Sequence, residues 1–266
     1  MKHALGADGV DAFYERLDDD RFASTGHTAG PWSSESQHLG PPSALLVRAL
    51  ERCAPRPEAL LSRVTFEVLG PVPVAELTVT AAVERPGRSV ELLAAELAHA
   101  GRPVLRARAW RIVAGDTAAV ASGEGEPLPP AAGCPPMAVP EHWQGGYLAA
   151  MEWRSVSGGI FAPGDATIWA RPVVRVVAGE EPSAAQRLFT VADSASGVSS
   201  RLDIRAWYAI NTDLTVHLHR EPVGEWFALD AQTVIGPSGV GVATSVLHDV
   251  RGPVGRSAQS LFVRER

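Results

Sequence analysis

The sequence predicts an α+β protein whose antiparallel strands surround a small number of helices, with the whole arrangement present twice. Segments of alternating apolar and polar residues, which are typical of strands, outnumber the amphipathic helices. Runs of strands around a single helix favour an α+β fold with an antiparallel sheet over a doubly wound α/β fold. Each half of the chain places one apolar helix before four strands and closes with a strand after a Gly-Arg turn, GRPVLRARAWRI and GRSAQSLFVRE. A repeat of roughly 120 residues is too long for a solenoid unit, so it indicates domain duplication.

The first half predicts a loop, a buried helix and a meander of strands. Residues 8–19 carry apolar side chains on one side and predict a short helix, and RFASTGHT (21–28) predicts a strand. A loop rich in Gly, Pro and Ser then leads into SALLVRALERCA, which is apolar on nearly all sides and therefore predicts a buried helix. Alternating residues predict further strands at 62–72 and 75–86 and a hairpin over 89–113 that turns at Ala100–Pro103.

Residues 116–140 are rich in Pro and Gly and show no periodicity, so we interpret them as a linker. The chain then divides into a first repeat at 1–115, a linker at 116–145 and a second repeat at 146–266. The second repeat predicts a helix over 183–198 and strands at 151–159, 166–177, 211–220, 225–235, 239–250 and 257–265.

Composition restricts the classes of partner and the compartment. A chain of 266 residues, of which 45% are hydrophobic, should fold as a soluble globule, and its net charge of −6 argues against nucleic acid or an anionic membrane as the main partner. Cys53 and Cys134 form no ligand cluster, and such sparse cysteine fits a reduced, cytoplasmic setting. The charged N-terminus is not a signal peptide, and no apolar run reaches the roughly 18 residues of a membrane span.

The stretch 181–219 carries the first candidate for chemistry. Asp193 lies in the predicted helix 183–198, with no Lys or Arg three or four residues away, beside the apolar stripe and not opposite it. A carboxylate there either lies on the solvated face of the helix or has a functional role, and the helical pattern leaves both possibilities open. The following strand, NTDLTVHLHR, alternates cleanly and places Asn211 and Thr212 on opposite faces.

Motifs along nearly the whole chain resemble the acyl-CoA thioesterase II family. In the first half these are QHLGPPSALLVRALE, with Gly40, Pro41 and Pro42 where the family has paired glycines, and the closing strand pair GRSVELLAAELAHAGRPVLRARAWRI. In the second half they are VADSASG, INTDLTVHLHR and SAQSLFVRE. The resemblance implies a tandem, or double, hot-dog fold in which two antiparallel sheets each wrap around a long apolar helix. It also implies further homo-oligomerisation of these units.

The family's active site consists of an Asp, a Thr or Ser and a Gln that hold a water against the thioester carbonyl. By resemblance the Asp falls on Asp193, the Gln on Gln259 and the Thr position on Asn211. Asn departs from the family pattern, although its amide group can also hydrogen-bond a water. A shift of one residue would restore the Thr as Thr212, but the strand pattern puts Thr212 on the apolar face, so Asn211 is preferred.

The chemistry of thioester hydrolysis suits these residues. The reaction needs a base within hydrogen-bond reach of a water, and burial in an apolar helix would raise the pKa of Asp193 toward a useful value. Gln259 could orient the water, and backbone N–H groups at a helix start or a glycine turn could stabilise the oxyanion. The mechanism requires no covalent intermediate, cofactor or metal.

Other interpretations of the same residues remain open. Asn211 could be a turn residue at the start of a strand and Gln259 an ordinary polar strand residue. His217 and His219 could bind a metal but lack a third ligand, so half-buried histidines are the simpler interpretation. Ser194 lacks the Gly-x-Ser-x-Gly elbow of a triad nucleophile. His38 lies in the loop before the first helix.

The sequence therefore predicts an acyl-CoA or related acyl-thioester hydrolase that uses Asp193, Asn211 and Gln259. A non-hydrolytic acyl-thioester binding protein is the first alternative, because of the Asn at the Thr position and the Pro-Pro in the first helix motif. A hot-dog dehydratase or hydratase is the second alternative, and it would use His38 with an acid partner. Acyl chain length and the choice between coenzyme A and a carrier protein stay open.

Overall fold

The main feature of the computed structural model is one large, strongly curved sheet. The structure describes residues 11–123, 125–140, 143–160 and 162–266. The strands of the first half run in the order β1-β2-β6-β7-β8-β5, and those of the second half run in the order β13-β16-β15-β14-β10-β9. The second order is the first one reversed, strand for equivalent strand, so the described residues show the repeat that the sequence predicts.

The strand bounds agree with most of the alternation in the sequence. In the first half they are β1 (Ala12–Arg16), β2 (Arg21–Ser24), β3 (Ala29–Gly30), β4 (Ser33–Gln37), β5 (Ala59–Val68), β6 (Glu76–Arg85), β7 (Val90–His99) and β8 (Arg102–Val113). In the second half they are β9 (Met151–Gly159), β10 (Ala162–Pro172), β11 (Arg175–Val177), β12 (Trp207–Asn211), β13 (Asp213–Leu218), β14 (Phe227–Ile235), β15 (Val240–Asp249) and β16 (Gly252–Glu265).

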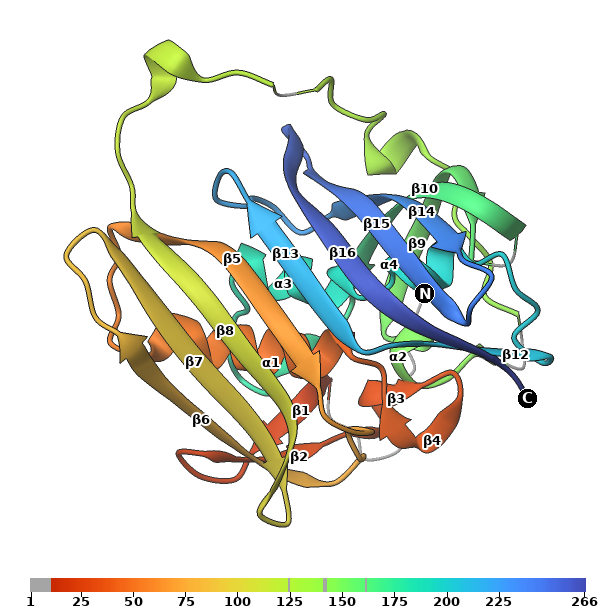
Figure 1. The fold of residues 1–266 in the computed structure, drawn as a ribbon, viewed down its shortest axis with the longest axis horizontal. Coiled ribbons are helices and arrows are strands. Elements are labelled where there is room, and N and C mark those ends of the chain that lie inside the picture. Colours follow the sequence, from red (N-terminus) through yellow and green to blue (C-terminus); the bar gives the residue numbers. More distant parts are fainter. Residues whose placement is uncertain (1–10, 124, 141–142, 161) are drawn as a thin grey trace.

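The expectation of two separate sheets is wrong, because the halves join at the centre of one sheet (Figure 1). Strands β5 and β13 pair antiparallel, with Val64 opposite Val216 and Thr65 opposite Thr215. The two threonine hydroxyls bond across the junction at 3.2 Å. A second link between the halves makes the sheet mixed, since β1 pairs in parallel with β11. The sheet of one half is thus hydrogen-bonded to the sheet of the other half. The alternation of residues within each half does not predict this pairing between the halves.

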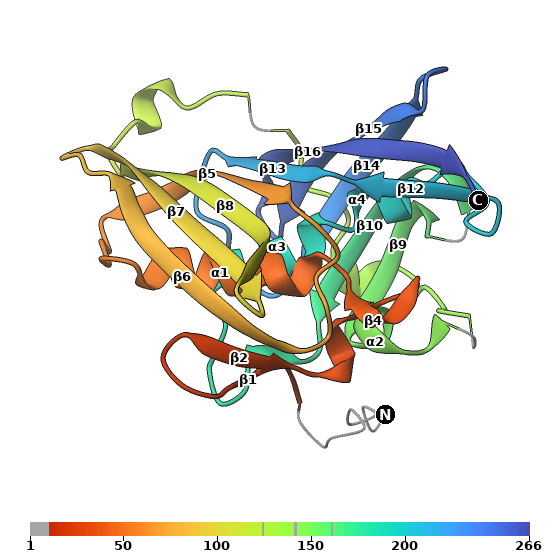
Figure 2. The same ribbon diagram turned by 60° about the horizontal axis from the view of Figure 1, so that its bottom comes forward.

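The helices lie on the concave side of this sheet. Figure 2 shows α1 (Gly40–Arg52) between strands β6, β7 and β8 on one side and β1 and β2 on the other. Most of α1 is buried, as the apolar sequence predicts. Helix α3 (Ala184–Ala192) packs against α1 in the antiparallel direction, because Gly40 at the start of α1 lies against Thr190 near the end of α3. At the other end, Ser183 and Gln186 donate to the Glu51 carboxylate at 2.7 and 2.6 Å.

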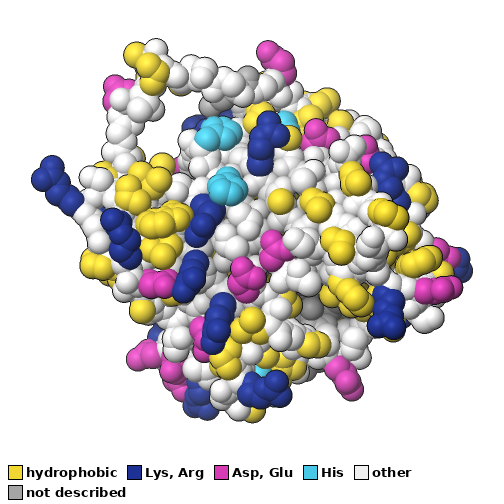
Figure 3. Space-filling model, in the orientation of Figure 1, with side chains coloured by type: hydrophobic (Ala, Val, Ile, Leu, Met, Phe, Trp, Pro, Cys, Tyr) yellow, Lys and Arg dark blue, Asp and Glu magenta, His cyan; other side chains and the backbone are white. Residues whose placement is uncertain are grey.

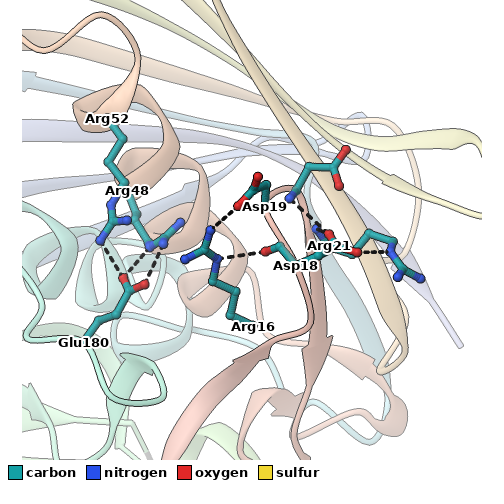
Figure 4. Close-up of polar contacts among 8 residues, drawn as sticks. Arg16, Asp18, Asp19, Arg21, Arg48, Arg52 and Glu180 are labelled. Atoms are coloured by element: carbon teal, nitrogen blue, oxygen red, sulfur yellow. Dashed lines mark hydrogen bonds and ion pairs between the residues drawn. The ribbon is translucent and has the colours of Figure 1, made fainter.

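A partly buried ion pair adds to this contact between the two halves (Figure 4). The guanidinium of Arg48, on α1, donates to both carboxylate oxygens of Glu180 at 2.6 and 2.7 Å, and Arg52 reaches the same carboxylate at 2.9 Å. Glu180 lies in the loop between β11 and α3. Since the pair is bidentate and Arg48 is largely buried, it fixes the position of α3 along α1.

The predicted helix 183–198 is interrupted, and the interruption falls on the candidate acid. Helix α3 ends at Ala192 and α4 (Ala195–Val198) follows it. The Ser194 N–H bonds to Val191 C=O at 2.9 Å, which closes α3 in a tight last turn. The Gln259 side chain enters the break: its Nε2 donates to Asp193 C=O at 3.0 Å, and its Oε1 accepts from Ser196 N–H at 3.1 Å.

Two predictions near the N-terminus are wrong in part. The helix at 8–19 is not formed, because residues 12–16 form β1, in which Ala12, Phe13 and Tyr14 are all buried; residues 8–10 lie outside the described residues. The strand at 21–28 ends at Ser24 and continues as a 3₁₀ turn at Gly26–Thr28. A short apolar cluster does not distinguish helix from strand by its period, and here long-range pairing decides.

The predicted linker is mostly irregular where it is described. It holds two short 3₁₀ turns, at Ala118–Val120 and Ala131–Gly133, and the four-residue helix α2 (Gly146–Ala149) follows it. Cys53 and Cys134 are free thiols. Among the helices of the described ranges, none is long and apolar enough to cross a membrane.

Gly40 permits the close approach of α1 to α3, and its replacement is expected to destabilise the protein. A Cβ at this position would lie 2.2 Å from the Thr190 carbonyl oxygen, so the helices would have to move apart. We expect Gly40→Ala to lower the free energy of unfolding by about 1–3 kcal/mol, measured by urea unfolding. Gly133→Ala is the control, since a Cβ there meets no atom within 4 Å; equal effects of the two changes would contradict the packing argument.

Candidate active site

Asp193 is the centre of a buried polar cluster at the end of α3. Its side chain is 6% exposed, so the alternative of a solvated helix-surface acid is wrong. Asn211 Nδ2 and Gln259 Nε2 both donate to its Oδ1 at 2.9 Å. The three residues that the sequence singles out therefore lie together, although they come from a helix end and two different strands.

Backbone contacts fix the orientation of both amide side chains. Gln259 is 1% exposed, and its amide is held at both ends by the break between α3 and α4. Asn211 Nδ2 also faces the Asp213 carbonyl at 3.4 Å, so its N–H side points toward two acceptors. The Oδ1 atom of Asn211 is consequently directed away from the carboxylate.

The structure places Asn211, not Thr212, beside Asp193. Thr212 lies at the break between β12 and β13, where its hydroxyl donates to Ser260 C=O at 3.5 Å. The alternation of the strand predicts Thr212 on its apolar face, and this prediction is wrong, because Thr212 is exposed. The buried residues of this segment begin at Leu214.

The first half of the chain also contributes to the cluster. His38, directly before α1, places Nδ1 3.4 Å from Asp193 Oδ2, and the N–H of the next residue, Leu39, bonds to the same carboxylate. The Gly40 N–H donates to His38 Nδ1 at 3.1 Å. The start of α1 and the end of α3 therefore enclose Asp193 from opposite sides, as antiparallel packing of the helices requires.

Tyr147 of α2 covers this corner of the site. Its ring stacks on the His38 ring at 3.7 Å between centroids and 4° between planes. Its hydroxyl donates to Thr190 C=O at 2.8 Å and lies 2.8 Å from Ser194 Oγ. Because the phenol proton is used on Thr190, Ser194 must donate to Tyr147 and is not poised as a nucleophile. Gly146 allows the approach of α2, since its φ is +54° and a Cβ would meet Ala29 C=O.

Burial controls the protonation of the site. Desolvation raises the pKa of Asp193 from 3.8 to about 7, against the opposing effect of the hydrogen bonds from Asn211, Gln259 and the Leu39 backbone. Desolvation also lowers the pKa of His38 to about 3. The His38–Asp193 contact is therefore not an ion pair near neutral pH, because the imidazole is neutral. Burial raises the pKa of Tyr147 well above its ordinary value, so the phenol stays protonated.

The possible metal site on the His-x-His strand gains no support. His217 and His219 are exposed and not half-buried as expected. Within the described ranges, no group of three or more His, Cys, Asp or Glu side chains lies close enough to hold a metal ion.

A broad concavity of about 740 Å³ lies elsewhere, on the outer face of the sheet over β5 to β8. Acidic and basic side chains intermingle on that face (Figure 3). Its lining residues Thr65 and Arg108 alternate with the buried Val64, Phe66 and Ala109, which face the helices. The sheet thus separates this concavity from Asp193.

Tyr147 is the part of the cluster that the sequence does not indicate. The sequence does indicate His38, but as a loop residue or as the histidine of a dehydratase and not as a partner of Asp193 in hydrolysis. One signal for His38 exists: in a duplicated fold with antiparallel helices, the residues before the first helix meet the end of the second. No local pattern around Tyr147 distinguishes it from an ordinary core residue.

Comparison with known proteins identifies the family and the fold of the chain. A model of the acyl-CoA thioesterase N-terminal domain matches residues 28–112, and a model of the C-terminal domain matches residues 131–263. None of the curated proteins matches the chain.

Several solved structures share the fold. A conserved hot-dog protein of unknown function from Alicyclobacillus acidocaldarius has a TM-score of 0.71 at 16% identity, over 96% of this chain and 97% of that one. The tesB protein of Mycobacterium avium subspecies paratuberculosis has a TM-score of 0.67 at 15% identity, over 94% and 96%. The acyl-CoA thioesterase II of Mycobacterium marinum has a TM-score of 0.64 at 15% identity, over 95% and 95%. These likenesses show a hot-dog fold, and with both domain models matched in order along the sequence, the chain belongs to the acyl-CoA thioesterase family.

Proposed function

We propose that the protein hydrolyses acyl-CoA or a related acyl thioester with a water activated by Asp193. The observation that carries the proposal is a buried carboxyl group whose pKa is about 7 and whose Oδ1 is held by the amides of Asn211 and Gln259. A general base is most effective when its pKa lies near the working pH. Water would attack the thioester carbonyl carbon while Asp193 takes one of its protons; the C–S bond would then break, and the leaving thiolate would take up the proton.

The two amides have different roles in this proposal. Gln259 is fully engaged with the protein and holds Asp193 in place. Asn211 has its amide oxygen directed away from the carboxylate and can accept a hydrogen bond from the attacking water. Asn211 would thereby replace the family's Thr as the water-orienting group.

The start of α1 is a poor source of oxyanion donors, contrary to one expectation from the sequence. The Gly40 N–H is used by His38, and Pro41 and Pro42 have no N–H. The oxyanion of the tetrahedral intermediate would have to be stabilised elsewhere.

The test of the proposal is thiol release from a panel of acyl-CoAs of short to long chain length. Release by the unchanged protein supports hydrolysis, and the preferred chain length defines the substrate. Absence of release on every chain, together with measurable binding, would favour the non-hydrolytic alternative.

Loss of the Gln259 side chain is expected to lower kcat/KM for thiol release by about 10-fold or more, because Asp193 would lose a hydrogen bond and its support at the helix break. The variant is Gln259→Ala, and the matched control is Gln232→Ala, whose exposed amide bonds to Asp165. A rate that is unchanged by Gln259→Ala would remove this residue from the mechanism.

Two alternatives each have one observation in their favour. The binding-protein alternative is favoured by the engagement of Gln259 at both ends, which leaves its amide unable to orient a water in this conformation. The dehydratase or hydratase alternative requires a histidine with an acid partner, and His38 lies against Asp193. Consumption of an enoyl-CoA by hydration, without thiol release, would favour the latter.

We also propose the wider setting that the resemblance implies. The partner is an acyl-CoA or other acyl thioester, the compartment is cytoplasmic, and tandem hot-dog units associate further into homo-oligomers. Support for association comes from exposed apolar side chains on the outer face of the sheet, among them Ile210, Val240 and Phe262, which pair across β12, β15 and β16. Light scattering of the purified protein tests this, and a monomeric mass would contradict it.

A further inference from the structure

The contact between His38 and Asp193 defines the tautomer of the imidazole. The Gly40 N–H donates to Nδ1 at 3.1 Å, so Nδ1 presents a lone pair and the neutral ring carries its proton on Nε2. The same lone-pair side of the ring faces Asp193 Oδ2 at 3.4 Å. Two acceptors face each other when Asp193 is ionised, whereas a proton on Oδ2 would lie between them.

The imidazole is held in this position. Tyr147 stacks on it in a parallel orientation, and Tyr147 is itself fixed through its hydroxyl to Thr190 and Ser194. Rotation of the His38 ring would break the Gly40 hydrogen bond and the stacking together. The lone pair on Nδ1 is thus a rigid part of the wall around Asp193.

The two carboxylate oxygens of Asp193 have different surroundings. Oδ1 accepts two amide N–H groups, from Asn211 on β12 and Gln259 on β16. Oδ2 faces His38, which precedes α1, and the N–H of the next residue, Leu39, donates to the same carboxyl group. The titratable groups facing the carboxyl group from the packed elements are His38 and Tyr147, and neither carries charge near neutral pH. A proton on Asp193 therefore has its best position on Oδ2.

We propose that His38 is a positioning residue for Asp193: its Nδ1 lone pair, which accepts the Gly40 N–H, is shared with protonated Oδ2 in a three-centre hydrogen bond and so stabilises the form of Asp193 that exists after a proton has been taken from water. This inference rests on the proposed function. The proton moves from water to Oδ2 and later to the leaving thiolate, and His38 itself stays neutral throughout. The first half of the chain thus contributes to chemistry whose other residues come from the second half.

The test compares His38→Phe with His38→Asn. Phe keeps a ring that can stack on Tyr147 and exclude water but has no acceptor. Asn keeps an acceptor, because its amide oxygen is bonded to Cγ as Nδ1 is, and that oxygen has lone pairs for both Gly40 N–H and Asp193. The first readout is the titration of Asp193 itself by carbon-13 NMR of protein labelled at aspartate carboxyl groups, with the signal assigned from its loss in Asp193→Asn.

We expect His38→Phe to lower the proton affinity of Asp193 by up to about tenfold, since one hydrogen bond to the protonated form is lost. The pH dependence of kcat/KM for thiol release should move in the same direction, with kcat reduced and KM unchanged. His38→Asn should restore both. An unchanged titration in His38→Phe would overturn the inference, and so would equal changes in His38→Phe and His38→Asn.

The two readouts separate this inference from the proposed function. Absence of thiol release by the unchanged protein would reject the hydrolase, while the NMR titration would still decide whether His38 controls the proton on Asp193. Thiol release that is identical in the unchanged protein and in His38→Phe, with an unchanged titration, would reject His38 alone.

Discussion

Asp193→Asn is expected to lower kcat for thiol release by about 100-fold or more, because a positioned general base contributes roughly 10²- to 10⁴-fold. Asn has nearly the same shape, and its amide oxygen can still accept from Asn211 and Gln259, so the site should remain assembled. What is lost is the ability to take a proton from water. Acyl-CoA binding by the variant should be retained, which separates chemistry from binding.

The same substitution is expected to stabilise the folded protein at alkaline pH. The pKa of Asp193 is about 7 in the folded state against 3.8 ordinarily, so between these values the folded state holds a proton that the unfolded state has lost. Stability from this group therefore falls as pH rises from about 4 to about 7, and it is constant above that. At pH 8, the free energy of unfolding of Asp193→Asn should be a few kcal/mol higher than that of the unchanged protein. This difference should become smaller as the pH is lowered toward 4.

The control for both measurements is Asp230→Asn. Asp230 is exposed on β14 and accepts from Thr167 at 2.9 Å, away from the buried cluster. We expect it to alter neither thiol release nor the pH dependence of stability appreciably. Thiol release by Asp193→Asn that equals that of the control would mean that another group is the base, and His38 would be examined next.

The sequence was sufficient for those parts of the fold that depend on local periodicity. Strands such as β14 and β16 alternate over most of their length, and the apolar surface of α1 predicts its burial. The break after Ala192 was not predicted, because it depends on Gln259 entering from a strand far along the chain. The same applies to β1, whose partners β2 and β11 decide its conformation. Pairing of β5 with β13, which makes one sheet of two, has no local signal either.

The candidate site shows the same division between local and long-range information. Asp193 was recognisable because an unpaired acid in an apolar helix is unusual, and Asn211 and Gln259 were assigned by resemblance. Burial of Asp193 and the contact with His38 depend on the antiparallel packing of α1 and α3, which brings the first turn of one helix to the last turn of the other. A helical pattern gives the face of a residue but not the element that covers it.

Removal of the Arg111 guanidinium is expected to have the largest effect on stability. Arg111, on β8, lies on the core side of the sheet with 4% of its side chain exposed, and it pairs with the equally buried Glu91 on β7 at 2.6 Å. Its other nitrogens donate to Cys53 C=O at 3.1 Å and Ala54 C=O at 2.8 Å, at the end of α1. One side chain thus satisfies a buried carboxylate and two carbonyls and attaches α1 to the sheet.

Arg111→Met keeps a long side chain of similar size but leaves Glu91, among the described residues, with the longer contact to Arg56, at 3.5 Å. Because a buried charge without its partner is costly, we expect a loss of about 3–5 kcal/mol in the free energy of unfolding, measured by urea unfolding at neutral pH. Adding Glu91→Met to Arg111→Met should recover part of that loss, since the uncompensated charge is then removed. The control is Arg108→Met, on the same strand as Arg111, which breaks an exposed pair with Glu84 of β6 and should cost far less. A similar loss in both single variants would show that burial of the pair does not determine its importance.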